Sequence, residues 1–184
     1  MASRRQWFVR ALWTVVIGGP LLVLGLYAIN PTGAQSLDPR ARILGISPFR
    51  VGSNGMASTL QAGQVVAIRV RGASDELKRG DIVTFRGHDG SGNVWMQRVV
   101  GLPGETLAIE EGLLIIGDQV IDEPYVEAER AQREYSQFVP LTRIPAGHYY
   151  LMGDNRDNSE DCRLHEPVPA EDILGTLAYA TPAP

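Results

Sequence analysis

Short apolar and β-branched segments, separated by turns that contain glycine or proline, recur along most of this chain of 184 residues. Such segments are typical of strands, and tight turns between them favour antiparallel pairing. The expected strands are residues 65–70, 81–86, 94–100, 106–109, 113–116, 149–152 and 173–179. The sequence therefore predicts a mostly β fold of coiled antiparallel sheets. Residues 126–137 are charged and rich in Ala, Glu and Arg, which is compatible with a short helix or a solvated loop.

An uncharged, apolar stretch occupies residues 11–29. At 1.5 Å per residue, a helix of this length is just long enough to cross a bilayer. Arginines precede the stretch and the next one is Arg40, which orients the N-terminus towards the cytoplasm. We expect a cytoplasmic segment at 1–10, a transmembrane anchor at 11–29, a linker at 30–48 and an extracytoplasmic domain at 49–184. A cleaved signal peptide ending near Ala34 is the alternative.

Composition excludes several classes of function. A formal charge of −4, a pI near 5.4 and the lack of a basic stripe after residue 50 argue against a nucleic-acid partner. Cys162 is the only cysteine, so no intramolecular disulfide is possible. The histidines, His88, His148 and His165, are scattered, and we expect neither a metal site nor another cofactor. A Cys162–His165 pair is conceivable from the spacing, although nothing in the spacing requires it.

The run Gly153-Asp154-Asn155-Arg156-Asp157-Asn158-Ser159-Glu160-Asp161-Cys162-Arg163 is unusually rich in side chains that bond to backbone and to each other. Asp and Asn favour turns, and arginine can hold a carboxylate with two parallel hydrogen bonds. The run therefore predicts a rigid, self-bonded turn that fixes a site, with an ordinary surface turn as the alternative.

This run resembles the last motif of the type I signal peptidases, with Cys162 where that family usually has Ser. Further segments resemble the family's other motifs in the same order, namely 53–60 (S-x-S-M-x-P-T-L in the family), 78–83 (K/R-G-D-hydrophobic) and 97–105 (K-R-V-V-G-L-P-G-D). The family, which includes the bacterial leader peptidases, consists of membrane-anchored serine proteases with a Ser–Lys pair. The resemblance implies its mostly β catalytic core and a role in processing exported proteins.

The chain departs from the family at the reacting pair. The resemblance places Gly55 at the nucleophile position and Gln97 at the general-base position. Glycine carries no nucleophile, and the glutamine amide is not a useful base at neutral pH. Lys78, the only lysine in the chain, lies in a turn-like segment. Ser53 and Ser58 are displaced from the nucleophile position, and small misplacements are costly for attack.

The other motif positions imply roles that need no catalytic pair. Ser53 and the Gly55 N–H match the donors of the oxyanion hole, and Met56, Leu60 and Val99 are expected to line a peptide groove. The residues that match site-bracing positions of the family are Arg98, Asp154, Arg156, Ser159, Asp161 and Arg163.

From these residues we expect a membrane-anchored family member that has lost hydrolytic competence. It would bind signal-peptide-like or pilin-like segments outside the membrane, or serve a secretion or surface-assembly system. An active signal peptidase I that uses displaced catalytic residues is the alternative. A purely structural domain is a third possibility if the groove is filled.

Overall fold

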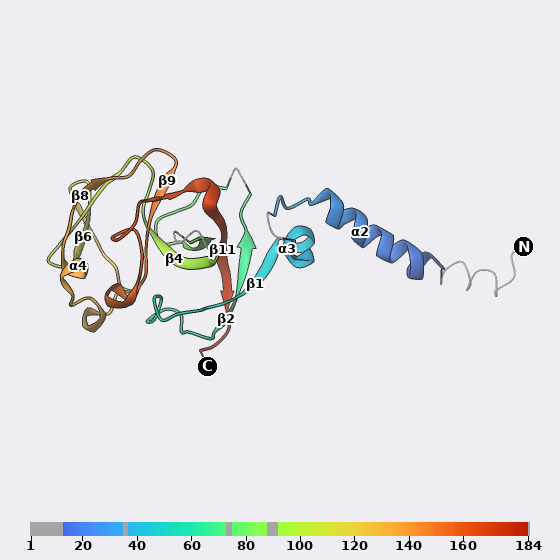
Figure 1. The fold of residues 1–184 in the computed structure, drawn as a ribbon, viewed down its shortest axis with the longest axis horizontal. Coiled ribbons are helices and arrows are strands. Elements are labelled where there is room, and N and C mark those ends of the chain that lie inside the picture. Colours follow the sequence, from blue (N-terminus) through green and yellow to red (C-terminus); the bar gives the residue numbers. More distant parts are fainter. Residues whose placement is uncertain (1–12, 35–36, 73–74, 88–91, 184) are drawn as a thin grey trace, which may run out of the picture.

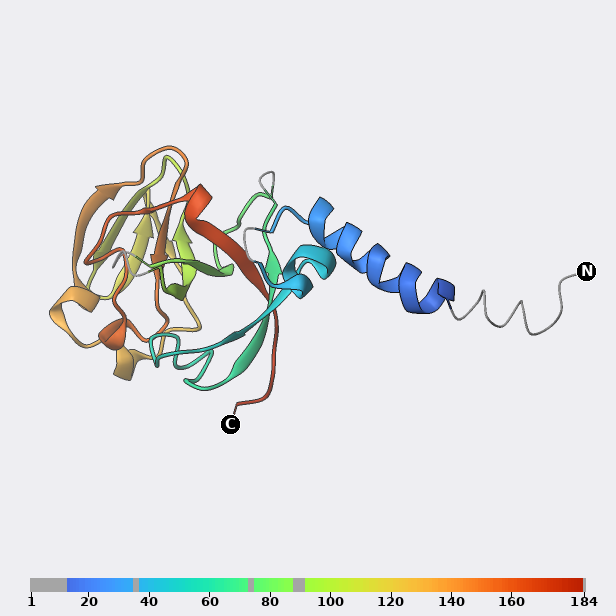
Figure 2. The same cartoon turned by 45° about the vertical axis from the view of Figure 1, so that its right-hand side comes forward.

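The computed structural model describes residues 13–34, 37–72, 75–87 and 92–183. A helical rod projects from a β-rich body, and the first described residues lie at the end of the rod that is far from the body (Figure 1, Figure 2). The rod consists of a π-helical segment, η1 (Thr14–Gly18), and α2 (Gly19–Ile29). Neither segment contains a buried residue. The helix ends at Asn30, which adopts a left-handed conformation and donates its backbone N–H to Leu26.

The expected transmembrane helix is not established by this structure. Within the described ranges, no helix combines the length and the apolarity needed to cross a membrane. Residues 1–12, which include the cytoplasmic segment and the start of the expected anchor, lie outside the described residues. The anchor therefore stays a prediction.

The stretch expected to be a linker, 30–48, contains ordered structure. A short helix, α3 (Pro39–Leu44), begins after Asp38, whose carboxylate accepts the Arg40 N–H. Strand β1 (Ile46–Arg50) begins before residue 49 and pairs with the next strand along its whole length. Pro48 hid this strand in the sequence, but a proline is tolerated in β1 because β1 is an edge strand.

The body contains two antiparallel sheets, which confirms the predicted mostly β fold. The larger sheet has seven strands in the order β1-β2-β11-β3-β4-β9-β10, and the smaller has four in the order β7-β6-β5-β8. The strands of the larger sheet after β1 are β2 (Val65–Val70), β3 (Ile82–Arg86), β4 (Val94–Gly101), β9 (His148–Met152), β10 (Val168–Pro169) and β11 (Ile173–Ala180). Those of the smaller sheet are β5 (Thr106–Glu110), β6 (Leu113–Ile116), β7 (Gln119–Ile121) and β8 (Val139–Arg143).

Strand β4 connects the core to a more open region. Its second half is fully buried, with Val99 and Val100 at 0% exposure, whereas Val94 to Met96 are exposed or half-buried. The main apolar cluster surrounds the buried half. A second cluster, which includes Met56 and Leu60, lies under the loop that follows β1. The fold thus places the first half of β4 opposite that loop.

The charged segment 126–137 forms two short helical turns, η2 (Ala128–Arg130) and α4 (Glu134–Gln137). It is attached to the body through Asp157. The Asp157 carboxylate accepts the backbone N–H groups of Gln132 at 2.8 Å and Arg133 at 2.9 Å, and the Ser136 hydroxyl at 2.7 Å. Although partial burial favours the neutral acid, these hydrogen bonds prevail and lower the pKa of Asp157 below its ordinary value of 3.8.

We predict that the attachment of 126–137 weakens in acid. The folded-state pKa of Asp157 is depressed. Its contribution to the free energy that holds residues 126–137 in place is therefore fully present above pH 3.8 and is lost as the pH falls through the folded-state pKa. At neutral pH, Asp157→Asn should mimic that loss, at about 1 kcal/mol per weakened hydrogen bond. Trypsin should then cleave faster after Arg130 and Arg133. Asp118→Asn, in the exposed turn before β7, is the control, and equal cleavage of both variants would contradict the prediction.

Candidate functional site

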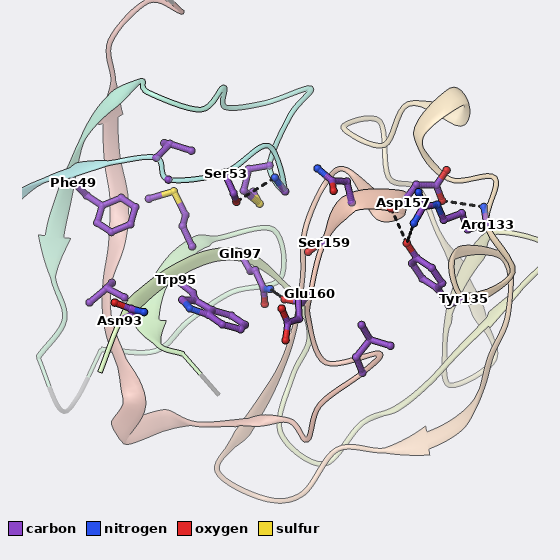
Figure 3. Close-up of a pocket in the computed structure, with 18 residues that line it drawn as sticks. Phe49, Ser53, Asn93, Trp95, Gln97, Arg133, Tyr135, Asp157, Ser159 and Glu160 are labelled. Carbon is purple, nitrogen blue, oxygen red and sulfur yellow. Dashed lines mark hydrogen bonds between the residues drawn. The ribbon is translucent and has the colours of Figure 1, made fainter. Parts of the chain in front are cut away.

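A groove of about 700 Å³ lies between the loop after β1 and the first half of β4 (Figure 3). One wall is formed by Phe49, residues 51–53, Gly55 and Met56, and the other by Asn93 and residues 94–97 of β4. Residues 157–160 of the polar run close one side. The three segments that resemble signal peptidase motifs around positions 55, 97 and 159 therefore meet at one place.

Gly55 lies in the first wall of this groove. A Cβ added there would lie 3.5 Å from the Asn158 carbonyl oxygen, 3.6 Å from Ser53 Oγ and 3.7 Å from Ser159 Oγ, all ordinary contact distances. The site thus has room for a Cβ atom, although it holds a glycine. The Gly55 N–H donates to Ser53 Oγ at 3.4 Å, which is a long hydrogen bond.

Gln97 lies in the opposite wall and is only 4% exposed. Its Nε2 donates to the backbone carbonyl of Glu160 at 2.5 Å. Its Oε1 is buried and, within the described part of the chain, has no hydrogen-bond partner. Buried polar atoms are nearly always paired, so this oxygen needs a physical explanation.

Among the residues that the structure describes, the groove-lining half of β4 has one edge that pairs with no other strand. Val99 donates to Asp81 and Gly87 donates to Asn93, which fixes the alternation of hydrogen bonds between β3 and β4. By this alternation, the backbone N–H and C=O groups of Val94 and Met96 point away from β3. On that side β9 pairs with β4 only from Arg98 onward. The strand edge beside the groove is therefore available to another extended chain.

A buried ion pair joins two of the groove's supporting segments. Arg98 Nε donates to Asp154 Oδ1 at 2.8 Å and its second nitrogen to Oδ2 at 2.6 Å, with Asp154 at 0% exposure. Thr59 also donates to Asp154, at 2.5 Å. The guanidinium carbon of Arg98 lies 3.9 Å from the ring centroid of Tyr125. This network joins β4, the loop after β1, the polar run and, through Tyr125, the segment between β7 and β8.

The polar run also bonds to itself. Arg163 holds Asp161 with two hydrogen bonds, at 2.8 and 2.9 Å, and Asp161 accepts the Gly153 N–H at 3.1 Å. Arg163 further donates to the Arg156 carbonyl at 2.7 Å. Arg156 does not hold a carboxylate of the run in the same way: it donates to the Gly153 carbonyl and forms an ion pair with Glu123 at 2.7 Å.

The displaced serines differ in their positions. Ser53 is exposed and lines the groove. Ser58 is directed elsewhere, because its hydroxyl donates to the Tyr125 carbonyl at 2.7 Å. Its φ of 118° is strained for a residue with a side chain, and a proline, which the family motif has here, cannot adopt this φ. Ser58 therefore does not provide a nucleophile to the groove.

The other candidate reactive side chains that the structure describes are also absent from the groove lining, and His88 lies outside the described residues. Lys78 is exposed and is not among the lining residues. Cys162 is 5% exposed within the main apolar cluster, and burial raises the pKa of its thiol to about 12. His165 does not pair with it: the thiol bonds to Leu151 and Glu166, and the imidazole lies 2.9 Å from a Glu160 carboxylate oxygen.

Two residues expected to line the groove are core residues instead. Met56 lines it, but Leu60 at 2% exposure and Val99 at 0% pack into the apolar clusters. In the turn after Gly55 and along β4, these positions face inwards. The sequence analysis did not identify Trp95 or Glu123, because neither lies in a motif position. For Glu123, the one available indication was that a buried Arg156 would need a carboxylate partner.

Comparison with known proteins identifies the family. A family model described as "Signal peptidase, peptidase S26" matches residues 39–180. Signal peptidase I U of Bacillus subtilis (strain 168) is 35% identical over 146 residues, covering 73% of this chain and 75% of that protein. Signal peptidase I of Pseudomonas aeruginosa is 30% identical over 170 residues, covering 72% of this chain and 60% of that protein. The chain therefore belongs to the signal peptidase family.

A solved structure of a signal peptidase I from Enterococcus faecalis V583 is also similar. It is 27% identical and aligns with a TM-score of 0.48, covering 56% of this chain and 97% of that one. Family membership rests on the sequence matches.

We predict that Gly153→Ala separates the two loops at the groove. A Cβ at this position would collide with the Gly55 carbonyl oxygen and the Ser159 side chain. The expected loss is about 1–3 kcal/mol in the free energy of unfolding, typical of overpacking. Denaturant titration measures it, with Gly52→Ala as the control because a Cβ there meets nothing within 4 Å. Equal stability of the two variants would show that the close approach is unimportant.

Proposed function

We propose that this protein holds an extended segment of an exported polypeptide in its groove and does not cleave it. The observation that carries the proposal is an open groove whose nucleophile and base positions are occupied by Gly55 and Gln97. The groove would retain a signal peptidase's means of binding peptide, without the pair of side chains that reacts with it.

The open edge of β4 supports binding of an extended chain. The backbone groups of Val94 and Met96 can pair with an added strand, and alternate side chains of that strand can enter the groove. The volume of about 700 Å³ supports a binding role over a purely structural one, because the groove is not filled by the protein's own side chains. Such binding depends on backbone hydrogen bonds and shape, neither of which needs a nucleophile.

The lining argues against hydrolysis. The described lining residues include no lysine or histidine that could take a proton from Ser53. In a well-studied unrelated protease, loss of the serine or of its base costs about 10⁶ in turnover. An active peptidase that uses Ser53 as a displaced nucleophile is the alternative, and its base would have to be a carboxylate, because the ionisable acceptors among the described lining residues are Asp157 and Glu160.

Family membership supports a proposal for the bound partner and the location. The relatives are named signal peptidases, so a signal-peptide-like segment is the first candidate ligand, and a pilin-like segment is the second. We propose that residues 11–29 anchor the chain in a membrane, with residues 1–10 in the cytoplasm and the domain from residue 49 outside. In that position the groove would be available to proteins during secretion or surface assembly.

We predict that the natural chain does not cleave a preprotein and that Gly55→Ser with Gln97→Lys introduces cleavage. Position 55 accepts a Cβ at ordinary contact distances, and Ser159 lies near enough to Gly55 to help orient an introduced pair. The measurement is turnover of a preprotein by detergent-solubilised full-length protein. The single variants are the controls, because each supplies only half of the pair.

The outcomes separate the two candidate functions. Cleavage by the double variant alone supports an intact binding groove and an inactive natural protein. Cleavage by the natural chain would contradict the proposal, and a Ser53→Ala variant would then test the displaced nucleophile. If neither cleaves and the natural chain binds no preprotein segment, the peptide-binding role is wrong.

We also predict that residues 11–29 retain the protein in membranes during alkaline carbonate extraction. Leu22→Arg with Leu24→Arg should release it, because each arginine near the centre of a span costs roughly 3 kcal/mol on insertion. Leu37→Arg is the control, since Leu37 is exposed and lies outside the proposed span. Release of the natural chain by carbonate would contradict the anchor.

A further inference from the structure

One polar atom in the groove lacks a partner that its chemistry requires. Gln97 Oε1 is buried and unpaired within the described part of the chain, although Gln97 lines the groove. Turning the amide over does not remove the problem. Its nitrogen donates to the Glu160 carbonyl, and an oxygen in that place would face another acceptor. The unpaired atom is therefore an acceptor, and it needs a donor.

The opposite wall offers the complementary group. The Gly55 N–H is a donor whose only hydrogen bond, to Ser53 Oγ, is long at 3.4 Å and can be exchanged for a better acceptor. A backbone peptide carries one acceptor, its C=O, and one donor, its N–H. The two walls thus present to a bound chain the donor and the acceptor that an intact peptide backbone would satisfy. Figure 3 shows Ser53, beside Gly55, and Gln97 on facing segments.

We propose that Gln97 Oε1 accepts a hydrogen bond from a backbone N–H of the bound segment, so that Gln97 is a positioning residue for an uncleaved peptide. The inference rests on the proposed function. A strand added along Val94 and Met96 brings backbone N–H groups past Gln97 at regular spacing. A neutral backbone N–H suits the neutral Gln97 oxygen, which itself offers a cation no counter-charge.

The proposed role of Gln97 is that of an acceptor, whereas a protonated lysine at the same position could only donate hydrogen bonds. A protonated lysine offers donors and no acceptor, whereas glutamine offers both. In this chain the donor of Gln97 is already used by Glu160, which leaves the acceptor for the ligand. With glutamine in place of the family's lysine, position 97 would no longer take a proton from a nucleophile. It would instead hold a backbone N–H of the bound segment.

The test is a calorimetric titration of the full-length, detergent-solubilised protein with a short, extended, alanine-centred peptide. A second set of probes replaces each backbone amide of this peptide, one at a time, by an ester, which removes one N–H. We expect Gln97→Met to weaken binding of the parent peptide by about 2- to 12-fold, the range of one hydrogen bond. We expect one ester analogue to bind the natural protein more weakly than the parent peptide does, by the same factor. The same ester should cause no further loss of affinity in Gln97→Met.

The matched control is Gln64→Met. Gln64 is also buried, at 6% exposure, but it lies outside the groove and both ends of its amide are used, by the Thr181 carbonyl and the Gln61 N–H. Gln64→Met should destabilise the fold more than Gln97→Met, and it should leave the pattern of ester effects unchanged. If Gln97→Met does not fold, the side-chain carbonyl carbon resonance of Gln97 gives the answer in the natural protein. This resonance should shift when the parent peptide binds. It should not shift with the ester analogue that lacks the N–H bonded to Gln97.

The failures are distinguishable. If the natural protein binds the parent peptide but no ester effect depends on Gln97, this inference is wrong and the proposed function stands. If the natural protein binds none of the probes, the proposed function is wrong and the inference falls with it.

Discussion

The buried pairing of Arg98 with Asp154 is the interaction on which the rest of the site depends. Neither charge is stable inside a protein without its partner, and removing one partner from such a pair costs about 3–5 kcal/mol. The pair fixes β4 relative to the polar run, and Thr59 adds the loop after β1. Because these segments form the walls of the groove, the pair fixes its shape from outside positions 55 and 97, and the Gln97–Glu160 hydrogen bond adds a further link between two of the same segments.

That separation explains how a reacting pair can be lost while the fold persists. Gly55 and Gln97 are neutral and small enough to fit, and neither takes part in the ion pairs that hold the walls. A lysine buried at position 97 would have to give up its proton or be stabilised by other groups. Glutamine has no such cost at any pH, so position 97 keeps one charge state where a buried lysine would titrate.

Much of the fold was predictable from the sequence because its strands are rich in β-branched residues. β2 and β6 begin and end at the expected residues. β1 was partly missed because Pro48 and the glycines before it suggested a linker, and only its position at the sheet edge makes the proline acceptable. β10 was missed because two residues carry no periodicity.

The site was predictable to the extent that motifs specify it. The positions of Gly55, Gln97 and the polar run in one groove follow from the motifs, and Arg163 holds Asp161 as its residue type suggested. The inward orientation of Leu60 and the pairing of Arg156 with Glu123 depend on packing between distant segments. The unpaired oxygen of Gln97 depends on where the Glu160 carbonyl lies, which no local pattern encodes.

Trp95 gives the groove a property of practical value. It lines the cavity beside Gln97 and packs edge-on against Phe85 and His165, with ring centroids 6.2 Å apart in both contacts. The other tryptophans of the chain, Trp7 and Trp13, belong to the N-terminal region. The protein therefore carries an intrinsic optical reporter in its groove, and light emitted by one indole registers whether water or another polypeptide occupies the space.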